Sequence, residues 1–296
     1  MRRVQNATRE ESRGIRLWVM HVRLPVREEK TGLLFLSHQP NKNLVRRSKM
    51  SSILYEKKGR IAYIRLNRPD KLNALGVELV KELSQAWLDF KEDDQLLVAV
   101  LSAEGRAFSA GHDVESLKVK DFNFEEACPL YHDIWKPVIA ALHGYVLGAG
   151  LFLALDCDIR VAAEDAEFGL PEVRLNIPSV RALRLPYYIP RGIAYELAFM
   201  ATRINAQRAY EVGLVNRVVP KDRLLQSAQE LAENICKNGP LAVGAQKMMY
   251  ERSKTMSLHD AQIMAPMIYA PVKASEDSKE AIQAYREKRK AEWKSR

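Results

Sequence analysis

The chain has 296 residues, of which 47% are hydrophobic, and a formal net charge of +9. This length allows one large domain or one domain with an appendage. No apolar run reaches the roughly 20 residues that a membrane-spanning helix needs. The cysteines Cys128, Cys157 and Cys236 are odd in number and lack metal-ligand spacing. Reduced thiols in a cytoplasmic protein without a structural metal are therefore expected.

The positive charge is concentrated at the N-terminus. Residues 1–49 hold 12 Lys/Arg and 4 Asp/Glu, so they carry +8 of the net charge and the remaining chain carries only +1. A nearly neutral body argues against nucleic-acid binding, because phosphate contacts dominate that affinity. Residues 1–49 also show no sustained periodicity. We interpret them as a basic extension that is either disordered or translated from a non-native start upstream of Met50.

Two other interpretations of residues 1–49 are weaker. Their arginine content is typical of an organelle transit peptide, but four glutamates in the segment argue against one. A basic nucleic-acid-binding arm would be expected to contain an aromatic-basic motif, and the segment contains none.

The body begins with patterns of alternating strands and helices. Ile53–Lys58 and Ile61–Leu66 alternate in polarity around Gly59, which predicts a hairpin. Apolar residues at helical spacing predict an amphipathic helix over 77–90, and apolar runs predict buried strands at 97–101 and 138–142. This alternation, without a Pro/Gly/Ser-rich linker, predicts repeated ββα units around a single core.

The C-terminal third is predicted to be mostly helical. We expect helices and one short strand in this order: helices 192–201 and 205–212, strand 215–219, helix 222–237, one long helix over 242–264, and a last helix over 277–293.

Two loops rich in small residues each follow a predicted buried strand. The first is Gly105–Asp113, and the second leads through the Gly-Ala-Gly step at 148–150 into the apolar stretch 151–155. That stretch is predicted to form a short buried helix with free N–H groups at its first turn. Two such loops can place two backbone donors around one carbonyl oxygen, as acyl transfer and enolate chemistry require. Taken alone, the stretch around 148–150 favours an ordinary tight strand-to-helix turn inside a core.

From about Ser51 onward the chain resembles the crotonase (enoyl-CoA hydratase/isomerase) superfamily. Five segments in order carry the resemblance: 66–75 (LNRPDKLNAL), 107–113 (AFSAGHD), 136–141 (KPVIAA), 144–150 (GYVLGAG) and 166–172 (AEFGLPE). The resemblance implies an α/β fold with a crotonase-like, repeated ββα spiral core over 50–200. It also implies a C-terminal helical trimerisation region over 201–296, so the expected assembly is a homotrimer or a dimer of trimers.

The resemblance also implies catalytic roles. The backbone N–H groups of His112 and Ala149 would bind the thioester oxygen of an acyl-CoA, and Glu172 would transfer protons. The His112 imidazole could contact the substrate or act as a second acid/base. A loop histidine that faces solvent or coenzyme A is the favoured interpretation. Without the family context, a surface glutamate that begins a helix after Pro171 would be the preferred interpretation of Glu172.

Two departures from the family pattern stand out. Hydratases of this family carry a second glutamate at the position of Phe152, and a phenyl ring can neither hold a water nor move a proton. The segment after Glu172 is one residue shorter than usual and lacks a glycine-rich turn, so this wall of the pocket is expected to differ. Asp113 lies where the family uses an aspartate structurally.

Substrate contacts implied by the resemblance involve the adenine, the pantetheine and the phosphates of coenzyme A. The predicted binding residues are Lys71, Leu72, Arg106, Ala110, Gly111, Asp113, Val114, Gly148, Phe152 and Lys288. Individually, the cations among them are also consistent with ordinary solvated side chains.

The sequence predicts an acyl-CoA enzyme of fatty-acid-type metabolism that needs no metal or redox cofactor beyond the coenzyme A of its substrate. One carboxylate favours enoyl-CoA isomerisation. Hydration remains an alternative if another group positions the water, as does another lyase, decarboxylase or hydrolase reaction. An alternative of another class is a catalytically silent crotonase-fold binding protein or an RNA-associated relative.

Overall fold

A computed structural model of the chain describes residues 52–295. The predicted extension over 1–49 lies outside the described residues. The described part begins with the hairpin β1 (Ile53–Lys58) and β2 (Ile61–Leu66), with Gly59 at φ +55° in its turn. The two strands pair antiparallel with Ile53 opposite Leu66, which confirms the predicted hairpin.

Two sheets form the core. The six-stranded sheet has the order β1-β2-β3-β5-β7-β10, and the four-stranded sheet has the order β4-β6-β8-β9. The further strands are β3 (Val98–Ala103), β4 (Ala107–Ser109), β5 (Val138–Leu142), β6 (Tyr145–Leu147), β7 (Ile159–Ala163), β8 (Glu167–Gly169), β9 (Arg203–Asn205) and β10 (Arg217–Val219).

From β3 to β8, consecutive strands therefore alternate between the two sheets. β3, β5 and β7 lie next to one another and parallel in the first sheet, while β4, β6 and β8 lie next to one another and parallel in the second. Each of the pairs β3–β4, β5–β6 and β7–β8 therefore adds one strand to each sheet. This is the repeated ββα spiral that the sequence predicts.

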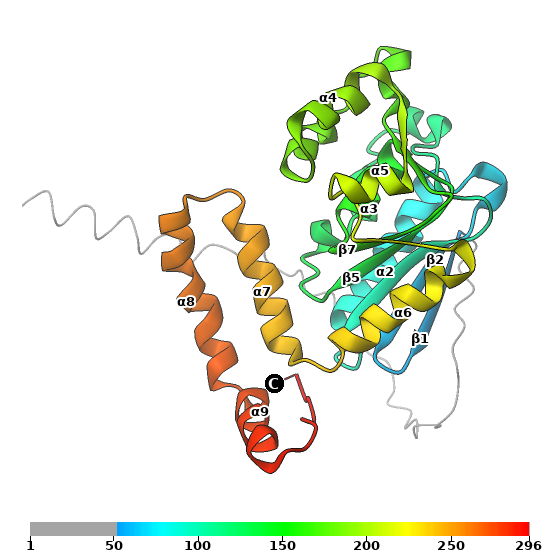
Figure 1. The fold of residues 1–296 in the computed structure, drawn as a ribbon. Coiled ribbons are helices and arrows are strands. Elements are labelled where there is room, and N and C mark those ends of the chain that lie inside the picture. Colours follow the sequence, from blue (N-terminus) through cyan, green and yellow to red (C-terminus); the bar gives the residue numbers. More distant parts are fainter. Residues whose placement is uncertain (1–51, 296) are drawn as a thin grey trace, which may run out of the picture. The chain divides into compact units, whose positions relative to one another are not determined.

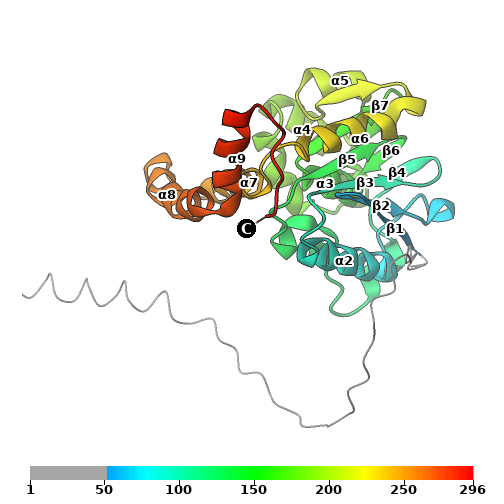
Figure 2. The ribbon, with the colours of Figure 1, turned by 90° about the horizontal axis from the view of Figure 1, so that it is seen from below.

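Helices cover both faces of the large sheet, as Figures 1 and 2 show. Successive strand side chains point to opposite faces. Leu101 and Ala140 accordingly belong to the cluster that includes the buried face of α2 (Val77–Glu92). Their neighbours Val100 and Ile139 pack with α6 (Leu224–Ile235). Both faces are thus closed to water, which explains why the central strands are apolar throughout.

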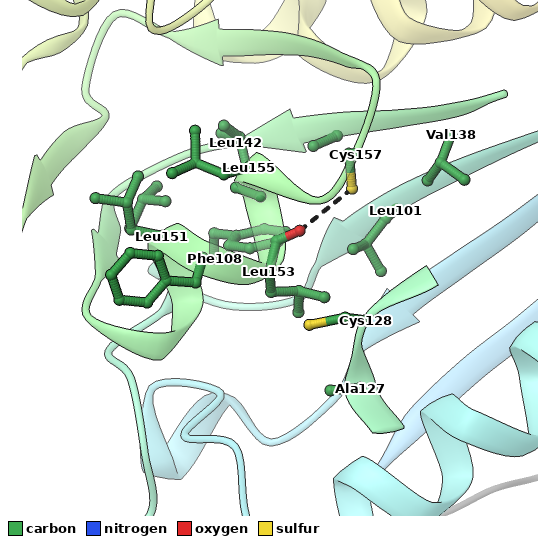
Figure 3. Packing of buried hydrophobic residues seen from close by; sticks show 14 of the residues in the cluster. Leu101, Phe108, Ala127, Cys128, Val138, Leu142, Leu151, Leu153, Leu155 and Cys157 are labelled. Atoms are coloured by element: carbon green, nitrogen blue, oxygen red, sulfur yellow. Dashed lines mark hydrogen bonds between the residues drawn. The ribbon is translucent and has the colours of Figure 1, made fainter. Parts of the chain in front are cut away.

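The short helix α3 (Ala149–Leu155) is buried on all sides, as its composition predicts. Figure 3 shows Leu151, Leu153 and Leu155 among buried side chains of β3 and β5. The helix ends in the same core, where the thiol of Cys157 contacts the carbonyl oxygen of Leu153 at 3.5 Å. Because every side chain of α3 is packed, the position of its N-terminus is fixed.

The remaining helices follow the predicted order. They are α4 (Arg191–Met200), α5 (Ala206–Glu211), α7 (Pro240–Ser253), α8 (Leu258–Ala274) and α9 (Glu276–Glu287). Short 3₁₀ helices occupy η1 (Pro69–Lys71), η2 (Val114–Lys118), η3 (Phe124–Ala127), η4 (Pro129–His132), η5 (Pro171–Leu175), η6 (Val180–Tyr187) and η7 (Lys221–Arg223).

Two C-terminal predictions are wrong in detail. The single helix expected over 242–264 is broken into α7 and α8, which lie side by side in Figure 1. The break occurs because Ser257 caps α8, its hydroxyl accepting a hydrogen bond from Asp260 N at 3.1 Å. The last helix ends at Glu287 rather than Trp293, because Lys288 adopts a left-handed conformation with φ +54°.

Candidate active site

The loop that follows β4 is held in place by backbone pairing with residues 72–75. Ala110 N donates to Leu72 O at 3.0 Å, and Leu75 N donates to Gly111 O at 2.8 Å. Asp113 N in turn donates to Leu75 O at 3.2 Å. In such a parallel bridge the bonds come from the residues on either side of His112. The N–H of His112 therefore points away from the pairing and has no hydrogen-bond partner within residues 52–295.

Buried side chains of this region reinforce the pairing. Asn73 is fully buried and donates to the carbonyl oxygens of Glu104 and Ala107, each at 2.8 Å. Ser109 donates to Asn73 O at 2.9 Å. The segments 66–75 and 107–113 are distant in the chain. Their polar residues Asn73 and Ser109 can be buried because these hydrogen bonds satisfy them.

The loop that leads into α3 packs closely against the loop that follows β4, and the closest approaches are at Gly111 and Gly150. A methyl group on Gly111 would lie 3.6 Å from the backbone N of Ala149, and one on Gly150 would lie 2.6 Å from Ser109 Cβ. Ala149 is the first residue of α3, so its N–H cannot bond within the helix. The structure thus brings the amides of His112 and Ala149 to the junction of the two loops, as expected for an oxyanion hole.

Glu172 lies against the same junction. Its Oε1 is so close to Gly148 that a methyl group there would approach it to 2.6 Å. Gly148 also has φ +52° and ψ −123°, a conformation that suits only glycine. Oε2 of Glu172 is buried and has no hydrogen-bond partner in the described chain. We call Gly111, Gly148, Ala149 and Glu172 the glycine side of the site.

Burial raises the pKa of Glu172 above its ordinary value, with a weaker opposing effect from a backbone hydrogen bond. The residue belongs to η5, which Pro171 begins and which ends at Asn176 in a left-handed conformation with φ +58°. Asn176 thus supplies a positive-φ turn in the segment where the sequence lacks glycines. A carboxyl group that is buried and unpaired is suited to exchanging protons near neutral pH.

The His112 ring is enclosed by aromatic side chains. Its centroid lies 4.9 Å from that of Phe124 and 6.3 Å from that of Phe122, both in edge-to-face geometry. Burial, and secondarily the charge of Arg181, lowers the pKa of His112. Its Nδ1 is buried without a hydrogen-bond partner among residues 52–295. The ring is therefore neutral at neutral pH and is not a solvated loop histidine.

Phe152 is 3% exposed and lies on the first turn of α3, facing the guanidinium of Arg181 with 6.0 Å between Arg181 Cζ and the ring centroid. The position that would hold a second carboxylate is therefore filled by an apolar ring. Asp156, the residue that follows α3, forms ion pairs with Arg181 and Arg184.

The other predicted binding residues divide into two groups. Leu72 and Ala110 are hydrogen-bonded to each other on the oxyanion loop, and Asp113 pairs with Arg68 at 3.0 Å and caps η2, which agrees with a structural role. The exposed residues of the predicted set are Lys71, Arg106, Val114 and Lys288. These side chains are exposed, and their contacts with coenzyme A stay a prediction.

Lys288 lies apart from the junction within this chain. The segment after α9 contacts the start of the large sheet, where Arg60 Nη2 donates to the carbonyl oxygen of Trp293 at 2.8 Å. Arg60 directly precedes β2, and β2 begins beside the start of β3. The two loops of the junction instead follow β4 and β6 of the four-stranded sheet. Within one chain, the structure therefore does not bring Lys288 to the site.

The sequence analysis missed Phe124 and Arg181 as neighbours of the site. Arg181 Cζ lies 5.0 Å from the Phe124 centroid, and the same ring contacts His112. Two features of the sequence could have indicated Arg181. Arg181 and Arg184 are spaced by one helical turn, and Asp156, which directly follows the apolar stretch 151–155, needs a positively charged partner. Within residues 52–295 no His/Cys/Asp/Glu group has the arrangement of a metal site. No helix of that region has the length and apolar character needed to cross a membrane.

Solved structures with the same fold include proteins described as enoyl-CoA hydratases or enoyl-CoA hydratase/isomerases. The structure superimposes on an enoyl-CoA hydratase/isomerase from Mycobacterium paratuberculosis with a TM-score of 0.78 and 37% identity, covering 83% of this chain and 100% of that one. It matches enoyl-CoA hydratase from Mycobacterium tuberculosis equally, with a TM-score of 0.78, 37% identity, and coverage of 83% and 99%.

Residues 56–296 match the family described as enoyl-CoA hydratase/isomerase, and the chain belongs to this family. Among similar curated proteins, carnitinyl-CoA dehydratase of Salmonella typhi is 37% identical, over 83% of this chain and 99% of that protein. Short-chain-enoyl-CoA hydratase of Clostridium acetobutylicum is 34% identical, over 82% and 97%. The crotonase fold and the role as an acyl-CoA-processing enzyme are thus confirmed.

Proposed function

We propose that this enzyme moves the double bond of an enoyl-CoA, with Glu172 as its only acid/base. Two observations carry the proposal: Oε2 of Glu172 is buried without a hydrogen-bond partner among residues 52–295, and position 152 holds a buried phenyl ring instead of a second carboxylate. A two-carboxylate site would hold a water between its acids. A one-carboxylate site is suited to removing a proton from one carbon and returning it to another.

The reaction balances with the groups that meet at the junction of the loops. Glu172 removes a proton from C2 of a 3-enoyl-CoA, and the electron pair moves onto the thioester oxygen as a dienolate. The N–H groups of His112 and Ala149 stabilise that oxygen, and each such donor contributes about 10²–10³ in rate. The protonated Glu172 then returns the proton to C4, which leaves a 2-enoyl-CoA and the starting enzyme. No cofactor beyond the coenzyme A of the substrate enters this scheme.

Hydration or dehydration is a second candidate. It is favoured by the names of two similar proteins, a short-chain-enoyl-CoA hydratase and a carnitinyl-CoA dehydratase. This reaction would need another group to hold the water in place of a carboxylate at position 152. A silent binding protein is disfavoured, because a buried unpaired carboxyl beside free amides is costly to retain without a use.

The test is an NMR time course in deuterated water with a 3-enoyl-CoA and a 2-enoyl-CoA. We expect the double bond to migrate with deuterium incorporation and without 3-hydroxyacyl-CoA, and Glu172→Gln to lower kcat by about 10²–10⁴. Rapid formation of 3-hydroxyacyl-CoA would replace the isomerase proposal by the hydratase. Absence of turnover with both substrates would contradict both.

Assembly and location are proposed on the same basis. Large apolar side chains such as Leu183 (75% exposed), Tyr187 (86%), Phe199 (72%) and Met267 (76%) are consistent with subunit contacts in a trimer or dimer of trimers. Cys128, Cys157 and Cys236 are unpaired, which is consistent with a cytoplasmic location. Size-exclusion chromatography with light scattering tests the assembly.

A further inference from the structure

Unpartnered polar atoms gather near the start of α3. Within residues 52–295, the buried side-chain nitrogen and oxygen atoms without a hydrogen bond come from His112, Glu172, Arg181 and Thr202. Glu172 is the proposed acid/base. Nδ1 of His112 and Nε of Arg181 have no part in the proposed reaction. Leaving a buried donor unsatisfied costs free energy, so these two atoms indicate a missing partner.

The two residues contact the same aromatic ring. Phe124 lies between them, with its centroid 4.9 Å from that of His112 and 5.0 Å from Arg181 Cζ. Arg181 also faces Phe152, at 6.0 Å, one turn after Ala149 along α3. His112, Phe124, Phe152 and Arg181 therefore form one continuous cluster of packed side chains beside the start of α3. We call it the ring side of the site.

Arg181 is held by ion pairs. Within residues 52–295 its Nε has neither a hydrogen bond nor an ion pair, whereas its Nη1 has an ion pair but no hydrogen bond. Nη2 pairs with Asp156 and Nη1 with Glu125, each at 2.5 Å. The Arg181 side chain is 15% exposed and Asp156 only 1%. Arginine does not lose its proton in proteins, so Nε is always a donor. A planar group fixed by two carboxylates and two rings presents that donor in one direction.

The charge around Arg181 determines which acceptor fits. Arg181 and Arg184 provide two positive charges, and Asp156 and Glu125 provide two negative charges, all in ion pairs. The cluster is therefore neutral overall and offers no excess charge to a carboxylate. The His112 ring is neutral as well and can donate or accept through Nδ1. A neutral oxygen with lone pairs is the complementary partner.

We infer that the ring side binds an oxygen atom in the acyl group of the substrate, so that the preferred substrates are oxygen-substituted acyl-CoA thioesters. The oxygen is that of a hydroxyl, ether or carbonyl group. It lies within a few carbons of the thioester, because only a few covalent bonds separate His112 Nδ1 from the amide that binds the thioester oxygen. The inference rests on the proposed function in one respect: the thioester oxygen must bind to the backbone N–H groups of His112 and Ala149.

The test compares saturated acyl-CoA ligands in matched pairs, using the full-length enzyme and isothermal titration calorimetry. Methoxyacetyl-CoA is compared with butanoyl-CoA, and 4-methoxybutanoyl-CoA with hexanoyl-CoA. Within each pair one methylene is replaced by oxygen, and none of the four ligands has a double bond to move. We expect the ether of at least one pair to bind at least about tenfold more tightly than its alkyl partner.

Two substitutions at Arg181 and one control assign the effect. Arg181→Met and Arg181→Lys both remove Nε, and the lysine retains a positive charge for Asp156. In each variant the ratio of the two Kd values should fall to about one or invert. Arg184→Met is the matched control, because Arg184 also pairs with Asp156 but donates to the Tyr188 hydroxyl at 2.9 Å rather than facing Phe124. It should retain the wild-type ratio.

The outcomes separate this inference from the proposed reaction. Weaker binding of both ethers by the wild type, or an unchanged ratio in both folded Arg181 variants, would overturn the inference. Isomerisation of plain 3-enoyl-CoA without an oxygen preference would leave the proposed function standing alone. An oxygen preference that depends on Arg181, in an enzyme that does not isomerise, would leave only the inference.

Discussion

The two sides of the site are built differently. On the glycine side, the contacts are made by backbone atoms and by the Glu172 carboxyl group, which leaves no room for a side chain at position 148. On the ring side, the contacts are between side chains, from His112 through Phe124 to Arg181. If the two proposals hold, the chemistry depends on where the backbone lies, whereas the choice of acyl group depends on side chains that can be exchanged without moving the backbone.

The largest loss of kcat is expected when one methyl group is added to the glycine side. Gly148→Ala would place Cβ 2.6 Å from Glu172 Oε1, and alanine does not readily adopt φ +52°. The strain would displace both the carboxyl group and the neighbouring amide of Ala149. We expect kcat to fall by about 10²–10³, the effect of losing one oxyanion donor. Steady-state kinetics with a 3-enoyl-CoA measures this loss.

Gly59→Ala is the matched control for backbone strain. Gly59 has nearly the same φ, +55°, but a methyl group there meets nothing within 4 Å. Its substitution should lower the melting temperature without lowering kcat. A Gly148→Ala enzyme as active as the Gly59→Ala enzyme would show that the glycine side does not depend on this close approach.

A smaller effect is expected on the ring side. His112→Phe retains the backbone N–H and allows a ring to pack against Phe124, so the oxyanion hole remains. We expect kcat to fall by less than about tenfold, because a group that transfers protons typically contributes 10²–10⁴. A loss in that larger range, accompanied by a change in the acid limb of the pH–rate profile, would assign proton transfer to the imidazole and abolish the distinction between the two sides.

The sequence predicts the glycine side better than the ring side, for physical reasons. Backbone roles require small residues at fixed spacing, and the loops around Gly111 and Gly148 show this pattern directly. The ring side depends on Arg181 meeting Asp156 across 25 residues of chain. No local periodicity encodes that contact, because η6 is a short 3₁₀ helix.

The same reasons account for the predicted fold. The hairpin β1–β2 and the helix α2 have long, regular apolar patterns, and both are confirmed. The strands β4, β6 and β8 each have three residues, too few for alternation to be recognised. The break between α7 and α8 depends on one capping serine, Ser257, which a count of apolar residues overlooks.

The smallest expected effect is on stability, and its sign is opposite to the effect on activity. Burial raises the pKa of Glu172, so on unfolding the carboxyl group releases a proton more readily. Between its unfolded and folded pKa values, the unfolded chain therefore binds fewer protons, and stability falls as pH rises through this window. Glu172→Gln removes the ionisable group and should raise the melting temperature at neutral pH. The gain should shrink as pH falls towards the ordinary glutamate pKa, where both states are protonated. Calorimetric scans of the wild type and of Glu172→Gln between about pH 4.5 and 8 measure this difference in melting temperature. An equal or lower melting temperature for Glu172→Gln at pH 8 would mean that the site stabilises the carboxylate.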